Sequence, residues 1–165
     1  MPTKYCQLPM CRKAAMEGGS FCSIGHGLAA LAITAGPILT KWRAQNPSVH
    51  VRGDEGRYNR RLVIIAGREM WIPDRAFRCL VTLAAARVQR RRLGGWVWAD
   101  ELGCTFCEAQ VAANLIRRML NLRVEWDHAG RRRLGVHPDR IWLNVPLLRE
   151  DRDHRISGLF KREKQ

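Results

Sequence analysis

Long apolar segments are missing from this 165-residue sequence. The longest uncharged apolar run, residues 27–40, has 14 residues and contains two glycines and a proline, whereas a helix that crosses a bilayer needs about 20 apolar residues. The first residues lack the apolar core of a secretory signal, and Cys6 already lies among them. We therefore expect no membrane association and a cytoplasmic, nucleoid-associated protein whose six cysteines stay reduced.

Acidic residues are scarce beside basic ones. The sequence has 15 Asp and Glu against 29 Lys and Arg, which gives a formal net charge of +14. Arginine supplies 24 of the 29 basic residues, and its guanidinium binds phosphate with two parallel hydrogen bonds. This excess predicts a polyanionic partner, with nucleic acid favoured over an acidic membrane surface. The alternative is a solvated basic surface that has no such partner.

Groupings typical of catalysis are also lacking. The five histidines are scattered, and none stands in a pattern with a carboxylate and a nucleophile. No carboxylate pair or histidine cluster suited to a catalytic metal is evident. We therefore expect neither an enzymatic activity nor a small-molecule substrate.

Three of the six cysteines lie within the first 22 residues. Cys6 and Cys11 have the spacing of a zinc-ligand pair, and Cys22 precedes His26 by one helical turn, so that these last two side chains face the same way. Three thiolates and one imidazole fill a tetrahedral, structural zinc site. Residues 1–27 are too short to hold a core unaided, and we predict that they form a module with one zinc per chain. The alternative is reduced thiols in an extended arm.

The cysteine-rich segment resembles the small Cys3His fingers of bacterial and phage DNA-associated proteins. The shared pattern is Cys-x-x-Pro-x-Cys, starting at Cys6, followed by Gly-x-Phe-Cys, ending at Cys22. The remaining cysteines, Cys79, Cys104 and Cys107, have no complementary ligand pair nearby in sequence. We expect them to be buried or half-buried structural thiols.

Domain boundaries follow from composition. Residues 28–61 are predicted to hold an apolar segment of one or two short helices, broken at Gly36 and Pro37, and then a polar linker at residues 45–61 that is rich in turn formers. Residues 146–165 are predicted to be a charged tail that frays. The one large folded domain is expected at residues 62–145.

Residues 62–145 carry regular patterns that predict an α+β fold. Strands at residues 62–65 and 69–72, with a turn at 66–67, read as a hairpin. Apolar residues at helical spacing predict a helix over residues 74–91. A brief strand at 96–98 and a short helix at 99–103 precede a helix at 105–121, where Thr105 and Glu108 have the spacing of a capping box. Strands at 124–127, 133–136 and 141–145 follow. The apolar stripe of the first helix consists of Phe77, Leu80, Val81, Ala84 and Val88.

One edge of the helix predicted at residues 105–121 is polar without being acidic. Apolar residues from Val111 to Leu122 gather on the opposite side. Amide side chains bond adenine and arginine bonds guanine, so this edge has the chemistry of a major-groove reader. The alternative is an ordinary solvated face. The edge consists of Gln110, Asn114, Arg117 and Asn121.

Two arginine triplets flank this helix in sequence. Arg90, Arg91 and Arg92 end the preceding long helix. The second triplet stands at the tip of the predicted hairpin, where it suits a minor groove or a phosphate backbone. It consists of Arg131, Arg132 and Arg133.

Residues 65–84, IAGREMWIPDRAFRCLVTLA, and residues 95–102, GWVWADEL, resemble the winged helix-turn-helix effector domain of OmpR/PhoB-type response regulators. Residues 116–119, which include Arg117 and Arg118, are similar to the Ile-x-x-Leu-Arg region of that family's recognition helix. The resemblance covers residues 62–145. It implies a winged helix whose recognition helix turns its polar edge and Arg118 to the major groove and whose wing carries the second arginine triplet. The sequence departs from the family at the end of the wing, where Arg140-Ile-Trp-Leu replaces a Gly-Tyr ending.

Together these features predict a sequence-specific DNA-binding transcriptional regulator. Its partner would be double-stranded DNA, with RNA polymerase or another complex subunit as a protein partner. The alternative is a non-catalytic nucleic-acid-binding subunit of a larger nucleoprotein or mobile-element complex. An RNA-binding role is a further possibility that charge alone does not exclude.

Overall fold

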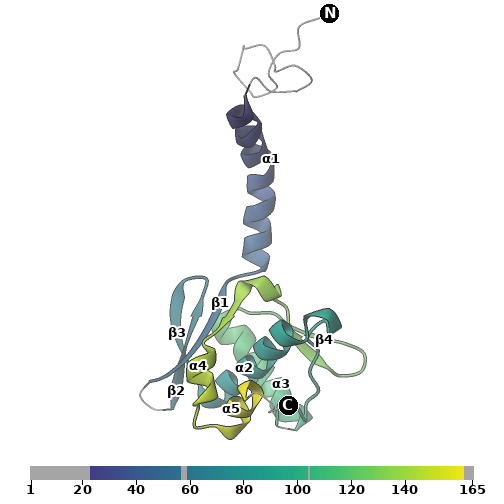
Figure 1. Cartoon of the computed structure of the whole chain (residues 1–165). Helices are drawn as coiled ribbons and strands as arrows, with labels where there is room; N and C mark the ends of the chain where they lie inside the picture. Colours follow the sequence, from purple (N-terminus) through teal and green to yellow (C-terminus); the bar gives the residue numbers. More distant parts are fainter. Residues whose placement is uncertain (1–22, 57–58, 104, 162–165) are drawn as a thin grey trace, which may run out of the picture. The chain divides into compact units, whose positions relative to one another are not determined.

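The computed structural model describes residues 23–56, 59–103 and 105–161, apart from the side chains of residues 24–27 (Figure 1). The chain divides into two compact units, residues 1–45 and 46–165. In the first unit, α1 spans Ile24–Gln45 without interruption. The expected break at Gly36 and Pro37 is therefore wrong, and the Thr40 hydroxyl donates a hydrogen bond to the Gly36 carbonyl at 2.9 Å. Within the described residues, no helix combines the length and apolarity that a bilayer crossing requires.

The second unit contains a four-stranded sheet in the order β3-β2-β1-β6. Its strands are β1 (Val49–Glu55), β2 (Arg60–Ile65), β3 (Arg68–Pro73) and β6 (Ile141–Leu143). The sheet is mixed, because β1 runs antiparallel to β2 and parallel to β6. β2 and β3 form the predicted hairpin, turning at Ala66 and Gly67, which both have positive φ. Such values at both central residues are those of a type I′ turn.

The polar linker expected at residues 45–61 is wrong, because β1 lies inside it at the centre of the sheet. Val49 and Val51 are fully buried there. Apolar and polar residues alternate only over residues 49–52, and the turn formers that suggested a linker lie on both sides of this short segment. Gly53, with a φ of 86°, stands where the register with β2 shifts, so the strand bends at a bulge.

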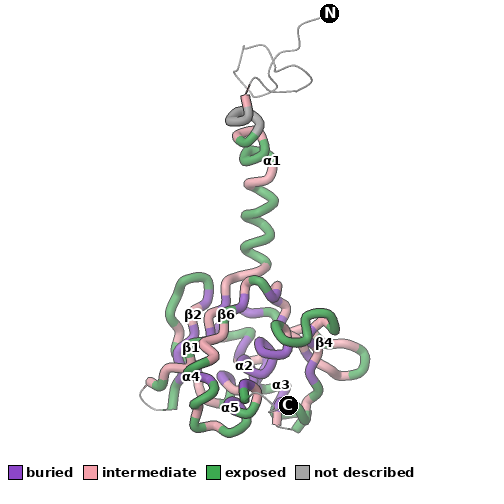
Figure 2. The backbone as a smooth tube through the Cα atoms, viewed as in Figure 1, coloured by how far each residue is buried: buried purple, intermediate pink, exposed green. Residues whose placement is uncertain are grey.

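Helix α2 (Asp74–Gln89) is the central element of this unit. It contacts the sheet, α3 and β5, and its middle part, residues 79–86, is buried without interruption (Figure 2). Four residues of its predicted apolar stripe are fully buried, whereas Val88 is 38% exposed. In Figure 1 the strands β1, β2 and β3 lie on one side of α2 and the hairpin containing β4 on the other. The helix is followed by η1 (Arg91–Leu93).

Helix α3 (Phe106–Leu120) begins at the predicted capping box. The Thr105 hydroxyl accepts from the Glu108 amide at 3.3 Å, and the Glu108 carboxylate accepts from the Thr105 amide at 2.9 Å. The pKa of Glu108 is lowered by the hydrogen bond that its carboxylate accepts from the Thr105 amide and by a second one from the Thr105 hydroxyl, at 3.2 Å. The short helix expected at residues 99–103 is a series of turns instead. After α3 come β4 (Val124–Trp126) and β5 (Arg132–Leu134), which pair antiparallel. Val97 forms an isolated antiparallel β-bridge with Arg132, so it extends this sheet on the other side of β5.

The charged tail expected to fray is wrong for most of its length. After η2 (Pro138–Arg140) and β6, two short helices follow, α4 (Val145–Arg149) and α5 (His154–Phe160). Leu148, Ile156 and Phe160 are buried among core residues. Charged residues stand between these apolar ones, so the sequence shows no clear apolar stripe with the period of a helix. The described chain is thus of mixed α and β class, as predicted.

A buried arginine ties the tail to the sheet. Arg61 on β2 is 3% exposed, and its guanidinium donates to both carboxylate oxygens of Asp151, at 2.8 and 3.1 Å. It also donates to Asp74 at 3.0 Å and to the Gly53 carbonyl at 3.1 Å. Burial alone lowers the pKa of Arg61, but the hydrogen bond and charge of Asp151, and then those of Asp74, outweigh burial and raise it.

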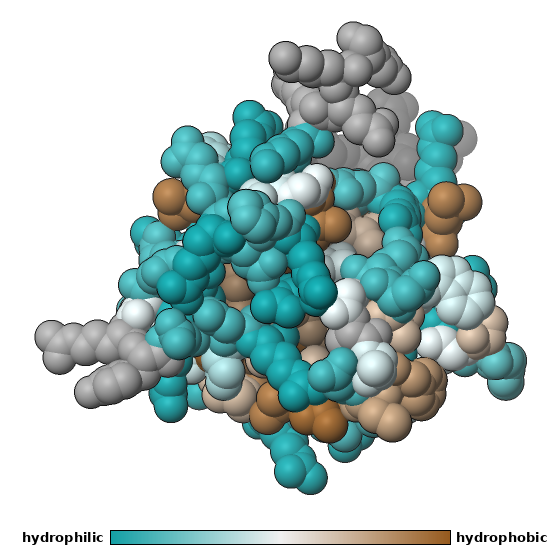
Figure 3. All heavy atoms as spheres, turned by 90° about the horizontal axis from the view of Figure 1, so that it is seen from below, coloured by the Kyte–Doolittle hydropathy of each residue, from teal (hydrophilic) through white to brown (hydrophobic). Residues whose placement is uncertain are grey.

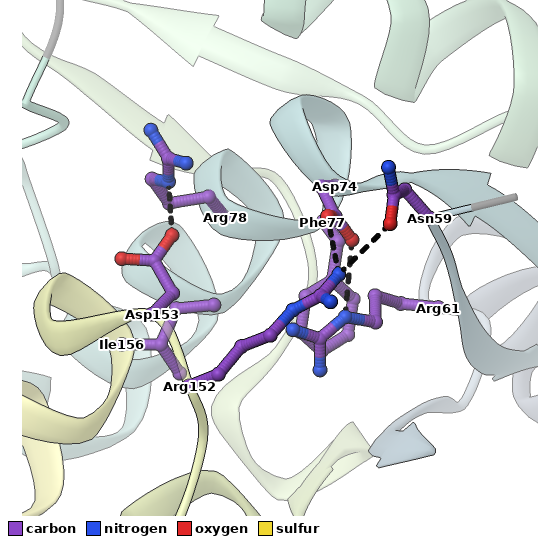
Figure 4. A pocket seen from close by; sticks show the side chains of 8 residues that line it. All are labelled: Asn59, Arg61, Asp74, Phe77, Arg78, Arg152, Asp153 and Ile156. Carbon is purple, nitrogen blue, oxygen red and sulfur yellow. Dashed lines mark hydrogen bonds and ion pairs between the residues drawn. The ribbon is translucent and has the colours of Figure 1, made fainter. Parts of the chain in front are cut away.

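Around this arginine is a pocket of about 370 Å³ (Figure 4). In it Arg78 pairs with Asp153 at 2.5 Å, and Arg152 donates to Asn59 and Asp74. Because carboxylates compensate each of these guanidinium groups, we interpret the pocket as an electrostatic clasp between β2, α2 and the C-terminal segment and not as an anion-binding site.

Replacing Asp151 by Asn tests this clasp. Asp151→Asn leaves the buried Arg61 charge without its main partner, so we expect the free energy of unfolding to fall by about 3 kcal/mol. Urea unfolding followed by circular dichroism measures the change. Asp139→Asn is the matched control, because Asp139 pairs with Arg91 in solvent, with side chains 59% and 57% exposed, and its loss should cost below about 0.5 kcal/mol. Equal effects of the two substitutions would contradict the clasp.

Candidate nucleic-acid interface

The exposed face of α3 is rotated from the one that the sequence predicted. The buried side is made by small residues and two larger ones, whereas Val111, expected inside, is 48% exposed. Asn114, Arg117, Arg118 and Asn121 follow one another at i, i+3, i+4 and i+7, which places them on one outward face. The buried residues are Ala109, Ala112, Ala113, Ile116 and Leu120.

Gln110 does not present its amide freely to solvent. It is half-buried, its Oε1 is enclosed and without a hydrogen-bond donor, and its Nε2 donates to Asn114 Oδ1 at 3.3 Å. The prediction that Gln110 lies on an open reading edge is therefore wrong in this conformation. Asn114 is also half-buried. It accepts the hydrogen bond from Gln110 and lies on the outward face of the helix.

Arg117 and Arg118 are exposed and differ from most arginines of the chain. Neither has a hydrogen bond or an ion pair within the described residues. Asn121 ends the helix in a left-handed conformation, with a φ of 52°, and is also exposed. This end of α3 therefore offers two free guanidinium groups and an amide side by side.

The second arginine triplet is divided between the two faces of the β4–β5 hairpin. Arg132 is fully buried, so its predicted place on an open tip is wrong. Its guanidinium packs against two rings that are themselves in edge-to-face contact, 4.6 Å from the centroid of Phe106 and 4.9 Å from that of Trp126. One nitrogen donates to the Phe106 carbonyl at 3.5 Å, and Nε and Nη1 have no hydrogen-bond partner among the described residues. Sequence reasoning could not see this, because arginine is almost never fully buried.

Arg131 and Arg133 lie on the opposite, outer face. Arg131 pairs with Asp127 at 2.7 Å and Arg133 with Glu125 at 2.5 Å. Burial alone would raise the pKa of Asp127, but the hydrogen bonds from Arg131 outweigh it and lower the pKa. Both arginines are partly exposed and remain candidates for contact with a partner.

The first triplet follows α2. Arg90 pairs with Glu101 at 2.5 Å, and this hydrogen bond is the main reason why the pKa of Glu101 is lowered. Arg91 pairs with Asp139 at 2.7 Å. Arg92 is exposed and without a hydrogen bond or ion pair among the described residues. Burial lowers the pKa of nearby Arg87, and the charges of Arg133 and Arg91 act in the same direction, against that of Glu125.

The predicted zinc ligands lie largely outside the described residues. Cys6, Cys11 and Cys22 belong to residues 1–22, and His26 falls in the first turn of α1, where side chains are not described. Among the described residues no group of metal-binding side chains occurs. Cys79 is buried in the core, as expected, whereas Cys107 is exposed on α3 and is not the buried or half-buried thiol that was predicted.

The aromatic side chains around the hairpin were not identified as site residues from the sequence. Phe106 and Trp126, which enclose Arg132, are 54% and 47% exposed, and Trp98 is 47% exposed. The signal available was the pair of tryptophans at alternate positions, 96 and 98, which has the period of a strand.

Comparison with protein-family models, with curated proteins and with solved structures finds no match to this chain. The functional interpretation therefore depends on the chain's own geometry and charge.

The face of the molecule drawn in Figure 3 is mainly hydrophilic, with hydrophobic residues in smaller patches.

Truncating Arg132 tests whether it is a core residue. We expect Arg132→Ala to lower the free energy of unfolding by about 2 to 5 kcal/mol, as for large-to-small core substitutions, and Arg132→Met, which keeps the volume, to recover most of it. Arg133→Ala is the matched control on the outer face and should cost about 1 kcal/mol or less. If Arg132→Ala is no more destabilising than Arg133→Ala in urea unfolding, the enclosed position of Arg132 is contradicted.

Proposed function

We propose that this chain is a sequence-specific DNA-binding transcriptional regulator of winged helix-turn-helix architecture. In this proposal α2 and α3, joined by the turns at residues 99–103, form the helical pair, and α3 is the recognition helix. The β4–β5 hairpin, extended by Val97, is the wing. The order of these elements and the packing of α3 and β5 on α2 support the assignment.

The observation that carries the proposal is the free cationic end of α3. Most arginines of the described chain are bound to carboxylates or backbone carbonyls, yet Arg117 and Arg118 are left exposed without a partner. Two unpaired guanidinium groups next to Asn121 repel each other, and no carboxylate among the described residues offsets this repulsion. Arginine bonds guanine and asparagine bonds adenine in the major groove, so this face has the chemistry of base readout.

Binding assays on selected DNA test this function. Selection from random duplexes is expected to yield a defined site, and fluorescence anisotropy on that site measures affinity. We expect Arg117→Ala to weaken binding by about 1 to 3 kcal/mol and to relax the base preference at one position, as for the loss of a base contact. Arg68→Ala is the matched control, since Arg68 is also exposed and without a partner among the described residues but lies in the β2–β3 hairpin. An equal effect of both substitutions would indicate general charge attraction only.

A second function is favoured by one observation. The side chains of α1 include large apolar residues that are strongly exposed, among them Leu28, Leu31 and Ile38 at 61, 62 and 69%. Exposed apolar surface of this kind marks protein contacts. The chain would then be a non-catalytic subunit of a nucleoprotein or mobile-element complex, and selection would return no preferred duplex.

We also propose one structural zinc per chain, held by Cys6, Cys11, Cys22 and His26. The donor set of three thiolates and one imidazole fits tetrahedral zinc without an open position for substrate. Its role would be to fold a segment that is too short to form a core.

Metal analysis of the purified protein tests the zinc site. We expect about one equivalent of zinc per chain, because four donors fill one tetrahedral ion. Cys6→Ser and Cys22→Ser should reduce the zinc content, and Cys104→Ser, the control, should leave it unchanged. Zinc that is lost with Cys104 or Cys107 instead would contradict this ligand set.

A further inference from the structure

The outer face of the wing carries an aromatic surface that readout of duplex DNA does not require. Val97 bridges to Arg132, so neighbouring residues on the two segments point to the same face of the sheet. Trp96 and Trp98 therefore share the outer face with Arg131 and Arg133. We call these four residues the tryptophan–arginine face.

The rings and guanidinium groups of this face are in contact. Arg133 lies 4.4 Å from the centroid of Trp96, and Arg131 lies 5.9 Å from that of Trp96 and 5.6 Å from that of Trp98. The inner face of the same strands is fully buried at Val97 and Leu134. The core contact of this sheet is thus made by other residues, and the tryptophans are not needed to supply it.

These contacts account for Trp96 but not for Trp98. A hairpin with three-residue strands is marginal alone, and the close Arg133–Trp96 stack is a sufficient reason for an aromatic residue at position 96. The cation–π contact of Trp98 is with Arg131, which also contacts Trp96. The distance of 5.6 Å between the Arg131 guanidinium and the Trp98 centroid is near the outer limit of such a contact. It remains 47% exposed, so much of its surface is open to a partner.

The charge balance of the face indicates which part of a nucleic acid it fits. Arg131 and Arg133 are each paired with a carboxylate, Asp127 and Glu125. A paired guanidinium is a poor phosphate ligand, since phosphate would have to displace the carboxylate. It still keeps one planar surface for stacking. A locally neutral face of flat groups suits a nucleobase, while the unpaired Arg92 supplies attraction for the backbone.

We propose that the tryptophan–arginine face stacks unpaired nucleobases, with Trp98 as the ring that receives them. The partner is then nucleic acid in which single-stranded nucleotides adjoin a duplex. This inference rests on the proposed nucleic-acid-binding function and specifies its substrate. Stacking on an aromatic ring does not depend on base identity, so the single-stranded part would be bound without sequence preference.

Binding of three labelled probes by the full chain tests the proposal. The probes are a blunt duplex of about 15 base pairs, long enough for one face of the double helix, the same duplex with a single-stranded tail of about ten thymidines, and the thymidine strand alone. We expect the tailed duplex to bind more tightly than the blunt one and the tail to quench tryptophan fluorescence. Trp98→Leu should remove this preference, a loss of roughly 5- to 100-fold for one stacked base, and leave blunt-duplex affinity unchanged.

Two further variants make the result specific. Trp98→Phe keeps a ring and should retain most of the preference for the tailed duplex, and it replaces the leucine variant if that one loses its fold by circular dichroism. Trp142→Leu is the matched control, because Trp142 is 44% exposed but lies on β6, stacked on His50. It should leave the preference intact.

The outcomes separate this inference from the proposed function. If the wild type binds tailed and blunt duplexes equally, or if Trp98→Leu keeps the preference, the stacking face is refuted while duplex binding stands. If Trp142→Leu removes the preference as completely as Trp98→Leu, the assignment to Trp98 is refuted. Absence of binding to all three probes would overturn both the stacking face and the proposed function.

Discussion

The packing of the buried Arg132 guanidinium against Phe106 and Trp126 fixes the hairpin against α3, and the rest of the candidate interface depends on it. A buried guanidinium without a carboxylate is costly, and the faces of the two rings offset part of that cost. Because Arg132 comes from β5, Phe106 from α3 and Trp126 from β4, this single contact joins three elements. It also determines the direction of its neighbours, since a strand that turns Arg132 inward must turn Arg131 and Arg133 outward.

Pairing divides the many arginines by role. Those that hold the fold are bound to carboxylates, as Arg61 is to Asp151 and Arg90 is to Glu101. Those on the free end of α3 have no partner within the described part of the chain, whereas about half of the other described arginines pair with a carboxylate. The net charge of +14 is therefore not spread evenly as solvated surface. An unpaired cluster is unfavourable for folding, and a polyanionic partner would relieve the repulsion.

The sequence predicted those elements whose signals are local. The capping box at Thr105, the β2–β3 turn and most of the apolar stripe of α2 were confirmed, because each depends on residues within one turn or one helix. Residues 49–55 and the C-terminal helices were missed, since both are held by partners distant in sequence: β6 pairs with β1, and Asp151 binds Arg61. The site followed the same division. Helical spacing placed Arg117 and Asn121 together on an exposed face of the helix, whereas the inward turn of Arg132 arises from packing between the helix and the hairpin.

Nucleic acid is proposed to meet the end of α3 and the outer face of the wing together. This can be tested by mapping backbone amide shifts by nuclear magnetic resonance as a tailed duplex is titrated into the full chain. We expect the largest shifts at residues 114–121 and 127–133 and near Trp98, with little change in β2 and β3. Shifts confined to α1 or to the β2–β3 hairpin, with those regions unaffected, would contradict it.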